Sequence, residues 1–340
     1  MSDELLPIAV VIPAYNSERF IGAALDSVFA QTRPPAQVIV VDDGSADRSA
    51  SIAQARGATV IRQANAGVSA ARNSGMRAAT QPWLAFLDAD DTWLPEKLAL
   101  QWAALCAGTG AKASITDRTL VDESGPVAGT LFTMNRDYPT LQRRRVAHEA
   151  FLLERAPMCA ALLRGNFVLL SSLVVDRELA LANGGFDETM CYCEDLDLTL
   201  RIAALTDVVA IEAPLVVKRA HGAAASIDRG KMQLGRAELT DRVVARPQLY
   251  PPGAREHCER ERPVRFKRAG MKFLDELQFE QSARALSTSL RYRFDGAAAT
   301  ALIVSRTLGA LRAERPLEAA RALLRHTRSW GRTRKSLIDA

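Results

Sequence analysis

Two aspartates separated by one residue are the first candidates for chemistry. Asp88 and Asp90 directly follow an apolar run, residues 83–87, that is typical of a buried strand. In an extended segment residues i and i+2 point to the same side, so both carboxylates can converge on one ligand. A few oxygen ligands suit Mg²⁺ or Mn²⁺ held jointly with phosphate oxygens. The pair predicts a divalent-cation site. The alternative is an acidic helix N-terminus, a role that fits Asp91 better because Pro95 opens a helix shortly afterwards.

A second acidic pair opens a predicted helix. Glu194 and Asp195 stand at the start of the helical pattern of residues 195–204. One of these carboxylates could take a proton from an incoming hydroxyl group as a general base. The alternative is that both only interact favourably with the helix dipole.

Four isolated side chains have both a functional and a plainer interpretation. Asp43 lies in the sequence Asp-Asp-Gly-Ser after an apolar run, which could equally be an ordinary turn. Tyr15 could stack on a nucleotide base or pack under a turn, and Arg72 could reach a diphosphate or lie on the surface. His221 follows a predicted strand and could complete a metal site, although a lone histidine is more often structural.

In the first hundred residues, short runs of apolar residues alternate with segments in which apolar residues recur at helical spacing. Short apolar runs predict buried strands, and apolar residues at helical spacing predict helices between them. Strands are expected at residues 8–12, 38–41, 59–61 and 83–87, and helices at 20–29, 47–56, 68–79 and 95–106. This alternation predicts an α/β fold with a mostly parallel, Rossmann-like central sheet covered by helices on both faces. Ligands of such sheets bind beyond the carboxyl ends of the strands, where Asp43 and Asp88 lie.

The pattern changes after this region. Further elements are expected as strands at 111–117, 171–175 and 208–217 and as a short helix at 178–182, whereas residues 118–165 are expected to be irregular. From about residue 232 the pattern is mostly helical. We therefore expect a boundary near residue 228, followed by a mainly helical C-terminal region at 229–340.

Composition excludes several classes of protein. The chain has 340 residues, of which 48% are apolar and 24% are charged, enough for a sizeable core and too apolar for wholesale disorder. No apolar run approaches the ~18–20 residues that span a bilayer, and residues 1–4 lack the features of a secretory signal. Five cysteines without framework spacing predict reduced thiols in a cytoplasmic protein.

The net charge of +5 is unevenly distributed. Residues 1–250 carry 25 basic and 29 acidic side chains, and residues 251–340 carry 19 and 10. A basic tail favours an anionic surface as a partner. Its few aromatic residues show no stacking pattern, so nucleic acid is not expected. The basic, amphipathic segment 317–326 favours peripheral contact at the inner face of the cell membrane, and a helical cap packed on the rest of the chain is the alternative.

Taken together, the motifs follow one order along the chain. They are Pro-Ala-Tyr-Asn at 13–16, Asp-Asp-Gly-Ser at 42–45, Arg-Asn-x-Gly at 72–75, Asp-Ala-Asp-Asp at 88–91, Gly-Gly-Phe-Asp-Glu at 184–188 and Glu-Asp-x-Asp-Leu-x-x-Arg at 194–201. Over about residues 7–226 this resembles the family-2 inverting glycosyltransferases, which have an A-type nucleotide-diphospho-sugar-binding fold. The resemblance implies a catalytic domain at 1–228, with a nucleotide-sugar half at about 1–110 and an acceptor half at about 111–228.

The resemblance also implies roles for the donor-binding positions. Pro13, Tyr15 and Asp43 would form the nucleotide-base pocket, with Asp43 accepting a hydrogen bond from the base edge. Arg72 would contact the nucleotide or the diphosphate. The expected donor is a nucleotide-diphospho-sugar, a UDP-sugar in the first instance.

Further roles concern the cation and the reacting groups. Asp90 would be the metal ligand proper, with Asp88 beside it on the ribose or the metal. His221 would reach the same ion, Mn²⁺ or Mg²⁺. Asp195 would be the catalytic base with Glu194 as its neighbour.

The acceptor side is less defined. Trp93 and Gly185 are candidates for contact with a glycan or lipid-linked acceptor, and core packing is the alternative for Trp93. The oligomeric state stays open.

The implied reaction is a single displacement. Asp195 would deprotonate an acceptor hydroxyl, which attacks the anomeric carbon with inversion as the nucleoside diphosphate leaves. Processive members of the family carry a Gln-x-x-Arg-Trp signature, which the chain lacks at 142–146 and at 328–330, so one sugar is expected per encounter. Bacterial polysaccharide or glycan assembly is the setting that the family implies.

Two other functions could use a similar fold. A sugar-phosphate nucleotidyltransferase would need a phosphate-cradling, Gly-rich loop after the first strand, where Pro13-Ala14-Tyr15-Asn16-Ser17 stands instead. A non-catalytic nucleotide-sugar-binding scaffold would need neither Asp90 nor Asp195.

Overall fold

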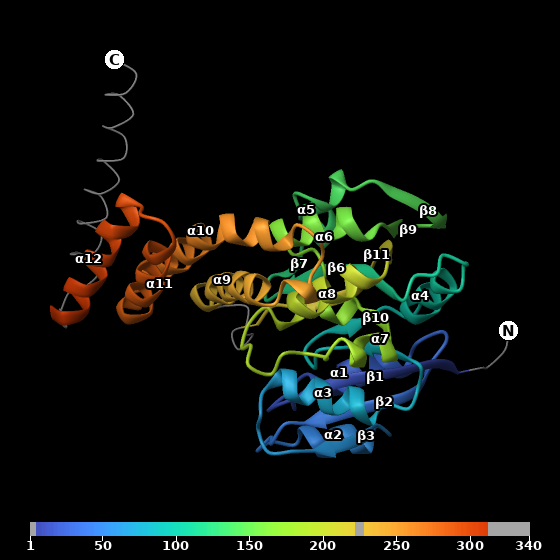
Figure 1. Ribbon diagram of the computed structural model, residues 1–340. Helices are drawn as coiled ribbons and strands as arrows, with labels where there is room; N and C mark the ends of the chain where they lie inside the picture. The colour runs from blue at the N-terminus through green and yellow to red at the C-terminus, as the bar shows by residue number, and fades with distance from the viewer. Residues whose placement is uncertain (1–4, 222–227, 312–340) are drawn as a thin grey trace. The chain divides into compact units, whose positions relative to one another are not determined.

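The computed structural model describes residues 5–221 and 228–311. Contacts divide the chain into two compact units, the first comprising residues 1–224 and 248–252, and the second comprising 225–247 and 253–340. Figure 1 labels most of their elements. The strands are β1 (Leu6–Ala14), β2 (Pro35–Asp42), β3 (Thr59–Arg62), β4 (Trp83–Phe86), β5 (Thr92–Trp93), β6 (Ala113–Asp122), β7 (Gly125–Val127), β8 (Arg143–Ala147), β9 (Ala150–Leu153), β10 (Val174–Asp176) and β11 (Val208–Arg219).

The helices divide between the units. Those of the first unit are α1 (Ile21–Phe29), α2 (Ser49–Ala55), α3 (Val68–Ala78), α4 (Lys97–Leu105), α5 (Leu131–Met134), α6 (Arg155–Arg164), α7 (Arg177–Ala182) and α8 (Glu194–Leu205). Those of the second unit are α9 (Arg229–Ala245), α10 (Ala254–Asp275), α11 (Phe279–Tyr292) and α12 (Gly296–Leu311).

One sheet runs through the first unit. Its main path has the order β3-β2-β1-β4-β10-β6-β11-β9-β8. The pairs among β3, β2, β1 and β4 are parallel, as is β6 with β11, whereas β10, β9 and β8 pair antiparallel to their neighbours. The expected α/β class with a mostly parallel sheet and C-terminal helices is confirmed, with antiparallel strands in its second half.

The apolar runs form strands because both faces of the sheet are covered. Alternate residues of β1 and β2 pack with apolar side chains of α1, α2 and α4 on one face. On the other face α3 lies so close that a Cβ at Gly75 would come within 2.4 Å of Val11 Cγ1 and 3.3 Å of Val41 Cγ2. The close approach of α3 to the sheet therefore requires glycine at position 75.

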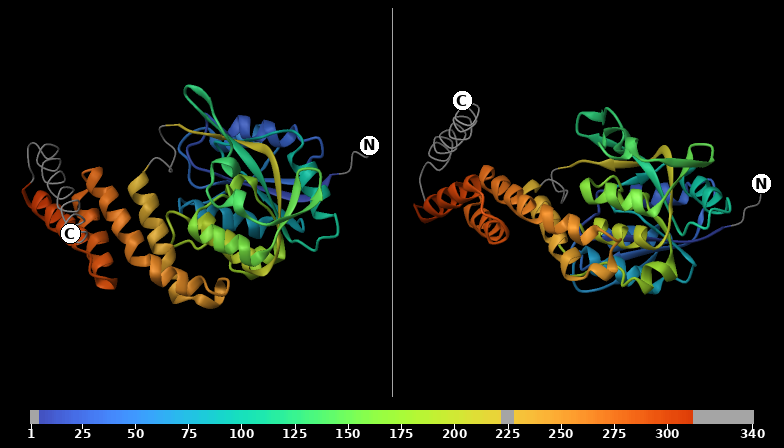
Figure 2. Two further views of the ribbon diagram at one scale, coloured as in Figure 1. Left: turned by 90° about the horizontal axis from the view of Figure 1, so that it is seen from above. Right: turned by 45° about the horizontal axis from the view of Figure 1, so that its top comes forward.

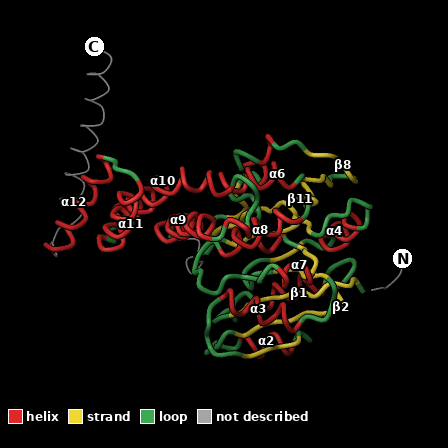
Figure 3. The backbone as a smooth tube through the Cα atoms, viewed as in Figure 1, coloured by secondary structure: helices red, strands yellow, loops and turns green. Residues whose placement is uncertain are grey.

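The expectation of an irregular stretch over residues 118–165 was wrong in part. β7, β8, β9, α5 and α6 all lie there, and β6 extends to Asp122. Figure 3 labels β8 and α6 of this stretch. The sequence Arg143-Arg144-Arg145 forms much of β8, which pairs only with β9 at the end of the sheet path. Because an edge strand keeps partly exposed, charged side chains, it lacks the apolar signature used to recognise buried strands.

The second unit consists of helices packed in succession. α9 packs on α10, α10 on α11, and α11 on α12 (Figure 2). Its apolar cluster includes Leu274, Leu286 and Leu308, and a Cβ at Gly270 would meet Leu286 Cγ at 2.5 Å. None of the described helices is both long enough and apolar enough to cross a bilayer. Segment 317–326, expected to contact a membrane, lies outside the described residues.

Candidate active site

Three aspartates gather in the loop after β4. Asp88, Asp90 and Asp91 each offer a carboxylate oxygen, and these oxygens lie within 4.8 Å of one another. The Ser171 hydroxyl donates to Asp91 Oδ2 at 2.6 Å and accepts from the Asp88 backbone N–H at 3.1 Å. One serine therefore ties together both ends of the acidic loop.

The three carboxylates have different surroundings. Burial, followed by repulsion from Asp88 and Asp90, raises the pKa of Asp91 to about 7, although Lys218 opposes the shift. Burial would also raise the pKa of Asp88, but attraction to Arg72 and Lys218 outweighs it and holds the pKa of Asp88 below its ordinary value. Negative charge is thus concentrated where a cation would relieve the repulsion.

The donor set of this loop fits a divalent cation. His221 Nε2 lies 2.9 Å from Asp90 Oδ2, and its ring packs on Phe20 with centroids 4.5 Å apart. Carboxylate oxygens suit Mg²⁺ and Mn²⁺, and an imidazole nitrogen beside them is acceptable to Mn²⁺. The predicted ligands Asp88, Asp90 and His221 therefore lie together, and Asp91 joins them.

Arg72 of α3 connects this loop to α8. Its Nη2 donates to Asp88 Oδ1 at 2.7 Å and its Nη1 to Glu194 Oε1 at 2.8 Å, with only 5% of the side chain exposed. Its Nε is buried without a hydrogen-bond partner in the described part of the chain. Two acidic motifs that are 106 residues apart thus lie within the width of one guanidinium group.

Asp195 lies beside this bridge at the start of α8. Cys193, in the left-handed region with φ 62°, turns the chain into the helix. Burial, followed by repulsion from Glu194, raises the pKa of Asp195 to about 6. Attraction to Arg72 opposes this rise, and repulsion from Asp88 adds to it. Glu194 is ion-paired with Arg72, whereas Asp195 forms no ion pair within 4.0 Å among the described residues.

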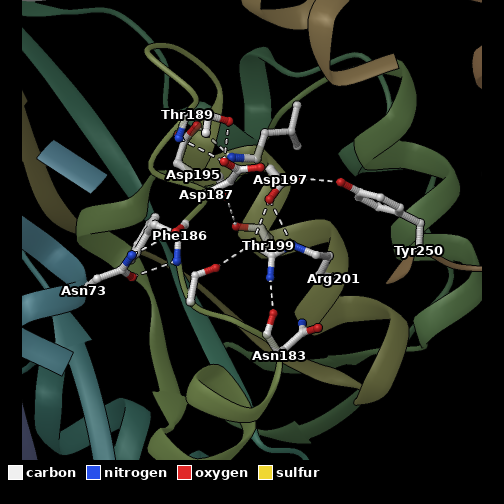
Figure 4. Close-up of polar contacts among 12 residues, drawn as sticks. Asn73, Asn183, Phe186, Asp187, Thr189, Asp195, Asp197, Thr199, Arg201 and Tyr250 are labelled. Atoms are coloured by element: carbon white, nitrogen blue, oxygen red, sulfur yellow. Dashed lines mark hydrogen bonds and ion pairs between the residues drawn. The ribbon is translucent and has the colours of Figure 1, made fainter. Parts of the chain in front are cut away.

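Asp197, in the first turn of α8, is held by hydrogen bonds from two other side chains. Figure 4 shows Tyr250 and Arg201 both pointing toward Asp197. The Tyr250 hydroxyl donates to Asp197 Oδ1, and Arg201 Nε and Nη2 donate to Asp197 Oδ2 at 2.9 and 2.7 Å. Arg201 also donates to the carbonyls of Asn183 and Gly185. This buried cluster joins α8 to the turn that precedes it.

A second buried contact holds the same turn to α3. Asn73 Nδ2 donates to the Phe186 carbonyl and Asn73 Oδ1 accepts from the Phe186 N–H, both at 2.9 Å (Figure 4). At Gly185, φ is 61°, and a Cβ there would come within 2.5 Å of Asn73 Oδ1. Packing therefore explains the glycine, and contact between Gly185 and an acceptor stays a prediction.

The residues predicted to bind the nucleotide lie at the ends of β1 and β2. Pro13 pairs with Val41 in the sheet, and Tyr15 is 55% exposed. Asp43 is buried and accepts from Gln63 Nε2 and from the N–H groups of Ala66 and Gly67. A carboxylate offers about four acceptor positions, so one remains for a ligand.

Trp93 lies in the core, not on an open surface. It is 3% exposed, its Nε1 donates to the Ser171 carbonyl at 2.8 Å, and Lys97 Nζ lies 4.0 Å from its ring centroid. This burial favours the core-packing interpretation, and contact between Trp93 and an acceptor stays a prediction.

Sequence reasoning missed three residues near the site. Lys218 lies on β11, where attraction to Asp91, Asp88 and other carboxylates raises its pKa against the effect of burial. A lysine late in an apolar strand was the available signal. Ser171 and Tyr250 have no comparable signal, because only tertiary folding brings them to the acidic residues.

Parts of the chain are similar in sequence to known proteins. Residues 9–158 match the family model described as Glycosyl transferase family 2. An uncharacterized glycosyltransferase of Rickettsia prowazekii, RP339, is 25% identical over 219 residues, 64% of each chain. The succinoglycan biosynthesis protein ExoW of Rhizobium meliloti is 45% identical over 100 residues, 27% of this chain and 31% of ExoW. An uncharacterized glycosyltransferase of Nostoc, alr2836, is 42% identical over 99 residues, or 31% of its own length, so these matches span less than two thirds of each relative.

Solved structures share the fold over most of the chain. S. aureus TarS 1–349 in complex with UDP-GlcNAc has a TM-score of 0.62 and 17% identity, covering 95% of this chain and 92% of that one. The mannosyltransferase PcManGT of Pyrobaculum calidifontis, in complex with GDP-Man and Mn²⁺, has a TM-score of 0.57 and 17% identity, covering 96% and 87%.

Proposed function

Because this chain belongs to the family-2 glycosyltransferases and has their A-type fold, we propose that it transfers a sugar from a nucleotide-diphospho-sugar to an acceptor hydroxyl with inversion. The observation that carries the proposal is the Arg72 bridge. It joins Asp88 of the acidic loop to Glu194, the neighbour of Asp195. The candidate cation site and the candidate base therefore lie close to one another, on either side of Arg72.

The donor is proposed from the chemistry of the strand ends and from the relatives. TarS and PcManGT were solved with UDP-GlcNAc and GDP-Man. In this chain Tyr15 offers an exposed ring for stacking, and Asp43 keeps one acceptor position for the edge of a base. We expect a UDP-sugar, with Pro13 shaping the same pocket.

The acidic loop supports binding of the diphosphate. Asp88, Asp90 and His221, with Asp91 behind them, would hold Mn²⁺ or Mg²⁺. Such an ion would neutralise negative charge on the departing diphosphate. Lys218 and Arg72 add fixed positive charge around the same loop.

Asp195 is the proposed general base. A pKa of about 6 leaves its carboxylate mostly ionised at neutral pH while keeping it basic enough to accept a proton from a hydroxyl group. Glu194 is held by Arg72, so its role is to position Arg72 and to raise the pKa of Asp195. The displacement needs no covalent intermediate, because the acceptor oxygen attacks the anomeric carbon directly.

The wider setting is proposed from the sequence. Without the Gln-x-x-Arg-Trp signature, one sugar is added per encounter to a glycan or lipid-linked acceptor in polysaccharide assembly. The basic C-terminal region would bring a cytoplasmic enzyme to the inner face of the membrane.

The proposal is tested by screening nucleotide sugars for Mn²⁺-dependent hydrolysis and transfer, with the product's anomeric configuration read by NMR. Asp195→Asn should lower turnover by about 10²–10⁴-fold while nucleotide binding is kept. Asp26→Asn, which breaks an exposed ion pair with Arg56, is the matched control and should not change turnover. Near-normal turnover by Asp195→Asn, or a product of retained configuration, would refute the proposal.

A further inference from the structure

The second unit contains a pocket that the proposed sugar transfer does not use. Its volume is about 470 Å³, within the range of sites that bind small molecules. One wall is a face of α10, formed by residues three or four positions apart, which lie on the same side of a helix. These are Val264, Lys267, Arg268, Met271, Lys272 and Asp275. Arg293 and Asp295, after α11, also line the pocket.

The charges of this pocket are not balanced. Lys267 Nζ is paired with Asp295 at 2.8 Å, and Lys272 Nζ lies 3.6 Å from Glu276. Arg268 and Arg293 have no carboxylate within 4.0 Å among the described residues. Asp275 also lines the pocket, so four cationic side chains share its walls with two carboxylates, and guanidinium groups are well suited to bind phosphate.

Apolar surface lies directly beside these cations. Val264 and Met271 contribute to the wall of the pocket. Phe294, between Arg293 and Asp295, is 79% exposed, the highest value among the large apolar side chains of the described residues. Binding of an inorganic anion would leave the phenyl ring in water, whereas a lipid surface would bury it and so lower the free energy.

We infer that this pocket binds the phosphate headgroup of an anionic phospholipid, with Phe294 inserted into the interface beside it. The inference deepens the membrane contact proposed above and rests on it, but it does not depend on sugar transfer. It also assigns that contact to α10 and to the α11–α12 turn.

The test is sedimentation of the full chain with two kinds of vesicle, one of phosphatidylcholine alone and one of equal parts phosphatidylcholine and phosphatidylglycerol. The wild-type chain should sediment only with the second. Arg268→Gln/Arg293→Gln should lower the partition coefficient about tenfold or more. Both arginines are exposed, so the fold should survive, which circular dichroism would check. Phe294→Ser should weaken binding without any change of charge.

The control is Arg284→Gln on α11. Arg284 is exposed, is paired with Glu280 and does not line the pocket. An equal loss in Arg284→Gln would show diffuse attraction to charge and overturn the inference. Absence of sedimentation, or titration of inorganic phosphate into the pocket without vesicle binding, would also overturn it. Donor hydrolysis by the wild-type chain without vesicles reports separately on the proposed transfer.

Discussion

At the scale of single residues, the site depends on how one arginine divides its hydrogen bonds. Arg72 binds Asp88 and Glu194, and for this reason we propose Asp195, not Glu194, as the carboxylate that takes the proton. Two adjacent acids therefore receive different roles from their surroundings. The Glu-Asp pair in the sequence could not distinguish them, because the distinction comes from a side chain 122 residues away.

The first prediction concerns the pH dependence of turnover. Because the pKa of Asp195 is raised to about 6, the base is protonated and inactive below that pH, and kcat should fall about tenfold per pH unit. Glu194→Gln removes one cause of the raised pKa and frees Arg72 to attract Asp195, so the acid limb should move to lower pH. A limb that stays in place or moves upward in Glu194→Gln, measured by pH–rate profiles, would contradict the assignment.

The second prediction concerns stability. Arg72→Met would leave the buried Glu194 and the half-buried Asp88 without their partner, which should lower the free energy of unfolding by about 3 kcal/mol. Arg56→Met is the control, because its exposed pair with Asp26 is worth about 1 kcal/mol or less. Urea denaturation followed by tryptophan fluorescence measures both variants, and equal effects would show that the bridge carries no special stability.

At the scale of elements, α8 is held by parts of the chain that sequence patterns do not connect. Asp197 accepts hydrogen bonds from Arg201, one turn along α8, and from Tyr250. Tyr250 belongs to the short segment 248–252, which is part of the first unit although it follows α9 in the sequence. The periodicity of residues 195–204 predicted this helix, because its apolar positions follow the helical repeat. Nothing in that repeat indicates Tyr250, since a single tyrosine in a polar stretch has no periodicity.

The third prediction is that Tyr250→Phe lowers the free energy of unfolding by about 1–3 kcal/mol, because Asp197 loses a donor in a buried setting. The substitution keeps the ring and its packing. Tyr15→Phe alters an exposed tyrosine of the same unit and should cost much less. Matched urea titrations compare the two, and a cost for Tyr250→Phe no greater than that for Tyr15→Phe would mean that this contact does not brace α8.

At the scale of the whole molecule, the alternation of strand and helix up to residue 106 was enough to place the acidic loops. Parallel strands end at the same edge, so Asp43 and Asp88 were expected beyond it, as found. The antiparallel half of the sheet was harder to predict, because β8 and β9 are short and their pairing depends on distant β11. Lys218 was missed for a different reason: its strand was predicted, but the carboxylates that act on it belong to other parts of the chain.

The central claim is that the acidic loop after β4 and Asp195 serve one bound donor. Crystals grown with Mn²⁺ and UDP, examined by anomalous diffraction at the manganese edge, test it most directly. We predict a single manganese peak in coordination with Asp90, with the diphosphate on the side of the ion that faces Asp195. Manganese and nucleotide bound away from Asp90, or a diphosphate separated from Asp195 by the body of the sheet, would contradict the claim.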